Sequence, residues 1–234
     1  MRNIIVGILT ACLWGGILVT GSLYAKEKKE YTVAVKLERV EREPGLEQEI
    51  KVKDGKLFDS GSFAIVWAPA PQGFRFRIYN KMNSPITILW NECRFIDEKG
   101  NPHNISHKGV KRPSLSEMKA MIPTVVFVGG NWQDVFFPFD SDYIKHEKEL
   151  VSFSQGAAAS RTYGKAGLRI QPIFIDKYKE KQVKKIVKKK SKKDKNFNFE
   201  TYINHHTYRV VMVLKFNETK YLYTFFFRAH LLDI

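Results

Sequence analysis

The chain has 234 residues, of which 39 are Lys or Arg and 24 are Asp or Glu, so its formal charge is +15. This length suits one β-rich domain or two small ones, and a hydrophobic content of 44% is enough to form a core, which excludes a wholly disordered chain. The two cysteines exclude a disulfide-dense miniprotein and a four-cysteine zinc site. The charge makes nucleic acid, anionic lipid or another acidic polymer a candidate partner.

The N-terminus predicts export. Residues 4–25 contain no charged side chain and lie between Arg2 and the charged residues 26–30. A positive start, an apolar stretch and a small residue before a polar boundary are typical of a secretory signal. As a helix the same residues would extend about 33 Å, which is enough to span a bilayer. We therefore interpret residues 1–25 as a signal peptide or membrane anchor, and expect 26–234 to form a single domain in the periplasm, in the cell envelope or outside the cell.

A third interpretation of the leader comes from the run Leu9-Thr10-Ala11-Cys12. This run resembles the bacterial lipobox, and the resemblance implies lipidation of Cys12 after cleavage. The apolar run that precedes it, residues 4–9, is shorter than that of a usual signal. A cleaved signal, a retained anchor and a lipidated Cys12 all stay open, and each places the rest of the chain outside the cytoplasm.

Short strand-like runs between turn signals follow the leader. Residues 74–79 alternate apolar and polar side chains, so that Phe74, Phe76 and Ile78 share one face of a strand. Further runs rich in β-branched and aromatic residues lie at 31–37, 63–67, 124–128, 168–171 and 173–175. Residues 208–216 and 221–229 predict a β-hairpin around the polar link 217–220. Short helices are expected only at 114–121 and 143–151.

Residues 74–138 contain a strand ending at Asn80, a strand at 85–88, a turn at 97–100, and Val128-Gly129-Gly130 followed by residues 134–138. This order resembles the immunoglobulin-like sandwich modules of bacterial envelope and secreted proteins. The resemblance implies an all-β chain: one antiparallel immunoglobulin-like β-sandwich, carrying the N-terminal hydrophobic leader and a Lys-rich insertion.

The Lys-rich insertion covers residues 177–195, with eleven lysines against Glu180 and Asp194. We expect it to be disordered, because like charges repel and few of its side chains are apolar. Val183, Ile186 and Val187 have the spacing of one narrow helix face, which could form on a partner. The tract predicts docking on an acidic protein, an anionic lipid surface or an anionic polysaccharide, whereas a solvated loop is the alternative. The candidate binding residues are Lys184, Lys185, Lys188, Lys189, Lys190, Lys192 and Lys193.

Nucleic acid is not expected as a partner, because the leader predicts export and no interleaved aromatic stripe accompanies the lysines. Association with a membrane through the N-terminus is a further expectation. No cofactor motif is present either. Residues 155–161 form a small-residue loop without the Gly-Lys-Ser/Thr ending of a phosphate-binding loop.

The candidate chemistry is sparse, so the chain is interpreted as a non-enzymatic binding or structural module of the bacterial envelope. The alternative is a metal-dependent hydrolase using His103, His107 and a carboxylate. These histidines lie in a Gly- and Pro-containing segment that predicts a turn, and no Glu follows His103 as in zinc proteases. Residues 140–142 resemble the start of a calcium loop but lack its later Gly and Glu. No catalytic residue or metal ligand is assigned.

Two further groups of residues are interpreted as core. Cys93 lies in an apolar segment without a visible activating histidine, so it is taken as a small buried residue rather than a nucleophile. Trp67, Trp90, Trp132 and the aromatic run 136–139 could line a ligand groove, but inward strand positions need large apolar side chains.

Overall fold

The computed structural model describes residues 29–43, 52–107, 121–140, 142–147, 150–151, 162–163 and 167–232. The expected leader with Cys12, and residues 114–120 of an expected helix, lie outside these ranges. Within them, no helix combines the length and the apolar character that crossing a bilayer requires.

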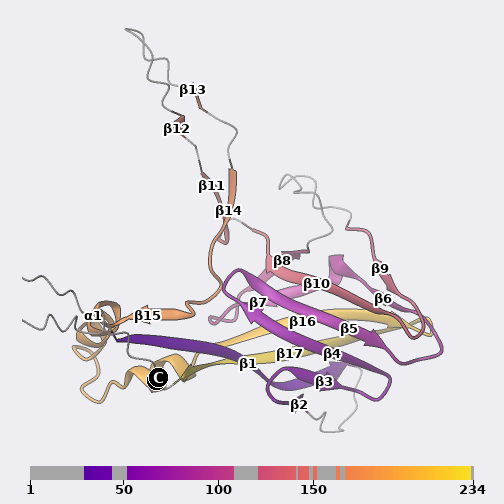
Figure 1. The fold of residues 1–234 in the computed structure, drawn as a ribbon, viewed down its shortest axis with the longest axis horizontal. Helices are drawn as coiled ribbons and strands as arrows, with labels where there is room; N and C mark the ends of the chain where they lie inside the picture. The colour runs from indigo at the N-terminus through magenta and orange to yellow at the C-terminus, as the bar shows by residue number, and fades with distance from the viewer. Residues whose placement is uncertain are drawn as a thin grey trace, which may run out of the picture.

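Thirteen strands form one antiparallel sheet (Figure 1). Along its main path the strands follow the order β15-β1-β17-β16-β7-β8-β10-β5-β4-β3-β2, while β6 pairs with β16 and β9. Their bounds are β1 (Glu30–Glu43), β2 (Val52–Lys53), β3 (Leu57–Asp59), β4 (Phe63–Ala70), β5 (Gly73–Asn80), β6 (Ile86–Ile88), β7 (Arg94–Ile96), β8 (Pro102–Ser106), β9 (Thr124–Val126), β10 (Asn131–Pro138), β15 (Lys177–Lys179), β16 (Thr207–Phe216) and β17 (Thr219–Leu232). The predicted all-β antiparallel class is therefore confirmed.

The sheet curls so that strands distant in its order face each other across one core. Trp67 on β4 lies with its ring centroid 4.9 Å from that of Phe225 and 5.3 Å from that of Phe227, both on β17. Phe74 on β5 contacts Phe227 in the same way, at 4.7 Å. The alternating apolar residues of β5 and β17 thus fill the concave side, as the period-2 pattern of residues 74–79 predicts.

The predicted C-terminal hairpin is confirmed, with a tighter turn than expected. Strands β16 and β17 pair from Thr207 opposite Arg228 to Phe216 opposite Thr219, which leaves only two residues in the turn. Asn217 and Glu218 have φ angles of 49° and 61°, the left-handed values of a type I′ turn. This turn matches the right-handed twist of the two strands that it joins.

Two sequence-based assignments are wrong. Residues 143–151 contain the strands β11 (Ile144–Glu147) and β12 (Leu150–Val151) instead of a helix. They pair with β14 (Gly167–Ile170) and β13 (Thr162–Tyr163), in a ribbon that projects from the main sheet in Figure 1. The segment 173–175 forms no strand, because Ile173 and Phe174 turn their side chains into the core.

The Lys-rich tract is ordered, which corrects the expectation of a disordered insertion. Its first residues form β15, where Tyr178 pairs with Tyr31 of β1, and residues Glu180–Lys190 form the helix α1. Val183 is only 7% exposed, and Ile186 and Val187 pack against the core of the same chain. The narrow apolar face that the spacing predicts thus packs against the core of the chain itself, with Ile186 and Val187 half-buried. A short helix α2 (Phe199–Asn204) and a 3-10 turn η1 (Trp90–Glu92) complete the described elements.

Candidate functional site

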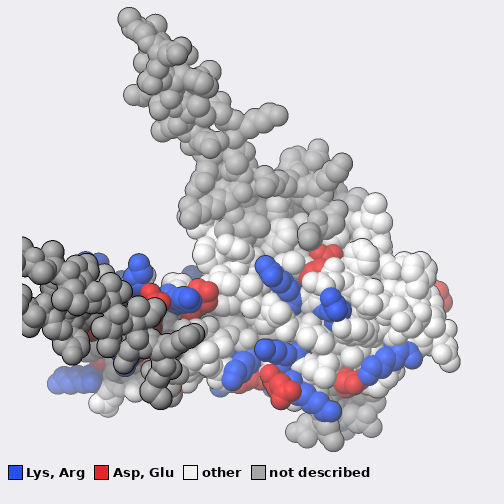
Figure 2. Space-filling model, in the orientation of Figure 1, with Lys and Arg blue, Asp and Glu red and all other residues white. Residues whose placement is uncertain are grey.

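The seven candidate lysines of the tract are all exposed. Five lie on α1, and Lys192 and Lys193 follow directly after the helix. Lys184 pairs with Glu180 one turn earlier, at 2.6 Å, and Lys190 places its Nζ 5.1 Å from the ring centroid of Tyr202. Figure 2 shows several basic side chains and a few acidic ones at the α1 end of the molecule, and basic and acidic side chains interspersed over the sheet.

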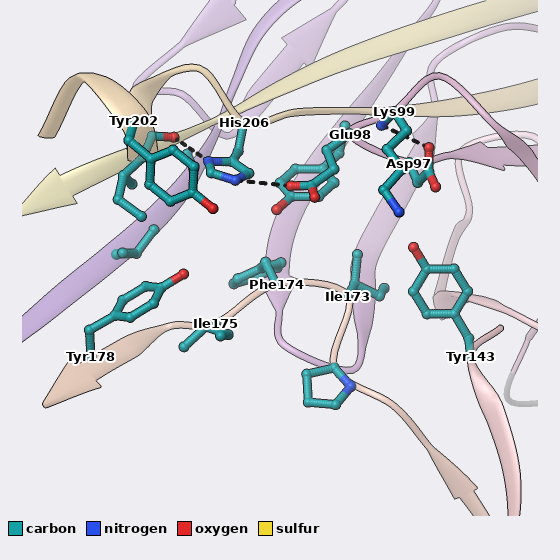
Figure 3. A pocket seen from close by; sticks show the side chains of 15 residues that line it. Asp97, Glu98, Lys99, Tyr143, Ile173, Phe174, Ile175, Tyr178, Tyr202 and His206 are labelled. Carbon is teal, nitrogen blue, oxygen red and sulfur yellow. Dashed lines mark hydrogen bonds and ion pairs between the residues drawn. The ribbon is translucent and has the colours of Figure 1, made fainter. Parts of the chain in front are cut away.

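A cavity of about 310 Å³ lies beside this helix (Figure 3). Its walls come from the strands β1, β15, β16 and β17, from α2, from the turn after β7, from Tyr143 and from the segment that follows β14. Four tyrosines line it: Tyr143, Tyr178, Tyr202 and Tyr208. Its apolar floor is formed by Ile173, Phe174 and Ile203, and its polar rim by Asp97, Glu98, Lys99 and His206. Sequence reasoning missed this site, because its residues come from six separate stretches of the chain and form no local motif.

Three of the tyrosine hydroxyls are available to a ligand. Figure 3 shows those of Tyr143, Tyr178 and Tyr202 pointing into the cavity. Among the residues that the structure describes, none of these three hydroxyls has a hydrogen-bond partner. Burial raises the pKa of Tyr143 and of Tyr178 to about 12, and the nearby negative charge of Glu98 adds to both shifts. The hydroxyls therefore stay protonated at neutral pH and can both donate and accept.

Two groups of the polar rim, Glu98 and His206, pair with each other. Glu98 Oε2 lies 3.1 Å from His206 Nε2, and His206 Nδ1 lies 3.1 Å from the carbonyl oxygen of Ile203. Because a carbonyl only accepts, Nδ1 donates to Ile203, and Nε2 faces the carboxylate of Glu98. This pair joins α2 to the turn after β7.

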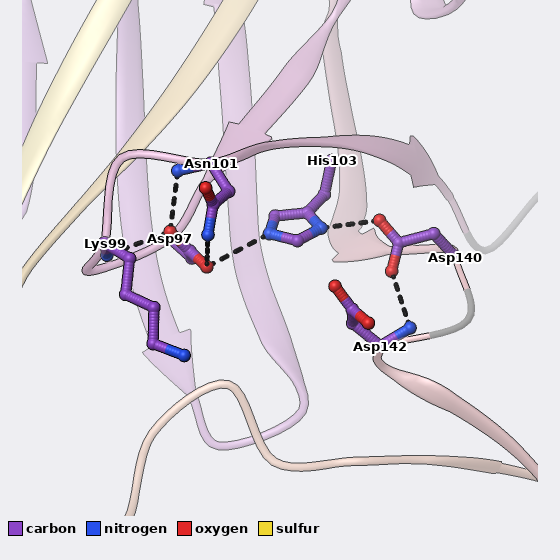
Figure 4. Close-up of polar contacts among 6 residues, drawn as sticks. All are labelled: Asp97, Lys99, Asn101, His103, Asp140 and Asp142. Carbon is purple, nitrogen blue, oxygen red and sulfur yellow. Dashed lines mark hydrogen bonds and ion pairs between the residues drawn. The ribbon is translucent and has the colours of Figure 1, made fainter.

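His103 lies between two carboxylates at the edge of the same site (Figure 4). Its side chain is only 5% exposed, its Nδ1 lies 2.5 Å from Asp140 Oδ2, and its Nε2 lies 3.3 Å from Asp97 Oδ2. Asp97 also accepts backbone N–H bonds from Lys99 and Asn101, at 2.9 and 2.8 Å. Burial favours a higher pKa for Asp97, but these hydrogen bonds outweigh it and hold the pKa below its ordinary value.

Possible metal ligands among the described residues are His103, Asp140 and Asp142, whose ligand atoms lie within 4.8 Å of one another. A cation there would compete with the Asp140 contact for Nδ1 of His103. Residues 140–142 lack the later residues of a calcium loop, but Asp140 lies next to His103, which is 37 residues away from it in the sequence.

The two histidines of the hydrolase alternative, His103 and His107, have different partners in the structure. Pro102–Ser106 is the strand β8 and not a turn, so His103 and His107 lie about 13 Å apart along it. His107 stacks on Trp90 with ring centroids 4.1 Å apart, and its Nδ1 lies 2.9 Å from Asp134 Oδ2. Each histidine has its own carboxylate on β10 or directly after it.

The core assignments are confirmed for most of the residues named. Cys93 is fully buried, and burial raises the pKa of its thiol to about 12, which is unsuited to a nucleophile. Trp67, Trp90 and Phe136 are buried in the core, whereas Trp132 is partly exposed.

No protein-family model, no curated protein and no solved structure matches the chain. The function is therefore inferred from the residues and geometry of the chain itself.

Proposed function

We propose that the chain is an exported, non-enzymatic binding protein of the bacterial cell envelope, which docks on an anionic polysaccharide through α1 and the residues after it. The observation that carries this proposal is the arrangement of α1. Its lysines are exposed along a helix whose apolar residues are held by the core. A fixed helix presents its charges without the entropic cost of ordering a disordered loop on binding.

The packing of α1 favours a polysaccharide over a lipid surface. Helices that bind in the interface of a bilayer bury an apolar face among the acyl chains. On α1 Val183 is buried, and Ile186 and Val187 are half-buried against the core of the chain, so the helix offers mainly its charges to a partner. Docking is then electrostatic and is expected to weaken as salt rises. An acidic envelope protein or anionic lipid head groups are the competing partners.

The compartment and the finer fold belong to the same proposal. Export is supported by the uncharged residues 4–25 after Arg2, whichever of the three forms the leader takes. The immunoglobulin-like arrangement proposed for residues 74–138 is supported by the antiparallel pairing of β5 with β10. This architecture is a common scaffold for binding through loops and edges.

A metal-dependent hydrolase is the second candidate, and His103, Asp140 and Asp142 favour it. It comes second because both ring nitrogens of His103 already face carboxylates, and because His107 has a different partner. Stoichiometric metal in the purified protein would favour this alternative.

The test of docking is a lysine replacement with a charge-matched control. We expect Lys185→Gln, Lys188→Gln and Lys189→Gln together to weaken binding to polygalacturonate about tenfold or more at low salt, because each basic residue near an anionic surface contributes about 1 kcal/mol. Lys36→Gln, Lys53→Gln and Lys56→Gln remove the same charge from exposed positions on the sheet. Binding is measured by biolayer interferometry with the full chain.

Two results would overturn the docking proposal. If both triple variants lose affinity equally, net charge and not α1 determines binding. If the protein binds vesicles containing phosphatidylglycerol but not polygalacturonate, the partner is a lipid surface and the polysaccharide is wrong.

A further inference from the structure

We propose that the tyrosine-lined cavity beside α1 binds one neutral, hexose-sized sugar unit. The inference rests on the proposed function, because it names the part of a polysaccharide that this pocket would hold. It concerns a different set of residues from the lysines, so the two can be tested separately.

The size of the cavity suits a small polar ring. At about 310 Å³ it lies at the lower end of the range for small-molecule sites, so it has room for one sugar unit and not for a long apolar chain. Its floor is formed by Ile173 and Phe174, which are buried and apolar. A sugar ring likewise has apolar and polar parts, because its faces carry C–H groups and its edge carries hydroxyls.

The groups that face the cavity match the edge of a sugar. The uncommitted hydroxyls of Tyr143, Tyr178 and Tyr202 enter from different sides and can each donate or accept (Figure 3). Tyrosine adds an aromatic face that packs against C–H groups, with little side-chain entropy to lose on binding. The carboxylate of Glu98 can accept from a sugar hydroxyl while it keeps its ion pair with His206.

The charges at the rim distinguish a neutral sugar from other small ligands. The rim carries Asp97 and Glu98 beside Lys99 and His206, so it has no excess of positive charge to hold an acidic sugar. An ammonium group would need an unpaired carboxylate, but Asp97 accepts from Asn101 and lies against His103, and Glu98 is paired with His206. Hydroxyl groups need only hydrogen bonds, which the three tyrosines supply.

The position of the cavity connects it to the lysine helix. Tyr178 lies in β15, directly before α1, and Tyr202 lies under the Nζ of Lys190 at 5.1 Å from its ring centroid. A polymer with acidic and neutral units could therefore place its charges along α1 while a neighbouring neutral unit enters the cavity. Two such linked contacts bind more tightly than either alone.

The test uses the full chain with ¹³C-labelled tyrosine and observes the ring signals by NMR during titration with D-galactose or D-glucose. We expect at least one of these hexoses to shift the signals of Tyr143 and Tyr178, with a dissociation constant in the millimolar range. Tyr178→Phe and Tyr202→Phe keep the ring but remove the hydroxyl, and each should weaken binding about three- to tenfold. Tyr221→Phe, at a half-buried tyrosine on β17 outside the cavity, should leave the affinity unchanged.

Other probes decide the ligand class. Glucuronate and n-butylamine, titrated in the same way, should shift these signals less than the hexose that binds. The pocket proposal is overturned if neither hexose shifts the tyrosine signals at a concentration of about 50 mM, near the top of the millimolar range. It is also overturned if butylamine binds more tightly than the hexose, or if Tyr221→Phe weakens hexose binding as much as Tyr202→Phe does.

The triple α1 lysine variant separates this proposal from the proposed function. It should keep the hexose affinity of the wild type while it loses affinity for polygalacturonate. Loss of polymer binding together with no hexose binding in the wild type would leave docking intact and remove the sugar site. If the wild type binds hexose but the lysine variant binds the polymer as tightly as the wild type, the sugar site stands and docking through α1 is wrong.

Discussion

His103 connects three parts of the chain through its two ring nitrogens. Asp97 follows β7, His103 lies on β8, and Asp140 follows β10 (Figure 4). Nδ1 is hydrogen-bonded to Asp140, and Nε2 lies 3.3 Å from Asp97 Oδ2 without a hydrogen bond, so one buried side chain on a strand contacts two loops. The same loops form one side of the tyrosine-lined cavity, because Asp97 is among its lining residues.

Asp97→Asn tests how much this arrangement stabilises the fold. We expect the free energy of unfolding at pH 7 to fall by about 1–2 kcal/mol, because a charged acceptor of several hydrogen bonds becomes a neutral one. The measurement is urea denaturation followed by circular dichroism. Asp54→Asn, at an exposed turn position, should unfold like the wild type. An unchanged Asp97→Asn variant would contradict a stabilising role for the carboxylate.

The same variant should change the pH dependence of stability. The folded-state pKa of Asp97 is below its ordinary value of 3.8, so the unfolded chain binds more protons between those two values. The contribution of Asp97 to the free energy of unfolding is therefore fully present above its ordinary pKa, at about pH 4. This contribution is lost as the pH falls through the folded-state pKa of Asp97. In Asp97→Asn this part of the acid destabilisation should be missing.

The sequence identifies these residues but not their partners. His103 and His107 stand out by spacing, yet each finds a carboxylate that is 37 or 27 residues away, through the pairing of β8 with β10. Of the four cavity tyrosines, only Tyr202 and Tyr208 lie close together in the chain. Long-range strand pairing determines such neighbours, and periodicity within a short segment carries no information about it.

At the scale of elements, sequence patterns succeed where local chemistry decides the outcome. The hairpin of β16 and β17 was predictable from two β-rich runs and a polar link. The segment 143–151 was not, because it is a strand only through its pairing with β14 and β13. The Lys-rich tract shows a third situation: its helical spacing was visible, but its partner is the chain's own core. Tertiary contacts therefore override a composition that favours disorder.

The hairpin turn contains a residue that fits its conformation poorly. Glu218 has a φ of 61°, which a β-carbon disfavours and glycine adopts freely. Glu218→Gly gives the Asn-Gly sequence preferred in type I′ turns, so we expect Tm to rise by about 2–4 °C in thermal unfolding. The exposed ion pair of Glu218 with Lys215 would be lost, at little cost.

Control variants separate the backbone effect from that ion pair. Lys215→Gln removes the pair while keeping Glu218, and it should change Tm very little. If Glu218→Gly lowers Tm, the type I′ turn is not the conformation that the hairpin adopts in solution.

At the scale of the whole molecule, one core holds the curled sheet together. Core residues come from β1, from β3 to β5, and from β16 and β17, and α1 and α2 add Val183 and Ile203. Trp67 occupies the centre: it is fully buried and its ring contacts rings of β5, β10 and β17. Because one cluster contains residues from both ends of the strand order, the sheet, the lysine helix and the cavity should unfold together.

Substitutions of Trp67 test this shared core. Trp67→Ala should lower the free energy of unfolding by about 3–5 kcal/mol, since it removes a large buried side chain and leaves a cavity. Trp67→Phe should cost much less, because Nε1 of Trp67 has no hydrogen-bond partner among the described residues, and phenylalanine removes that unpaired group. Phe127→Ala, at an exposed position, should change the free energy by less than about 0.5 kcal/mol. Urea denaturation of each variant is followed by tryptophan fluorescence and by far-ultraviolet circular dichroism. Coinciding transitions are expected, whereas two separate transitions would show that the sheet contains more than one cooperative unit.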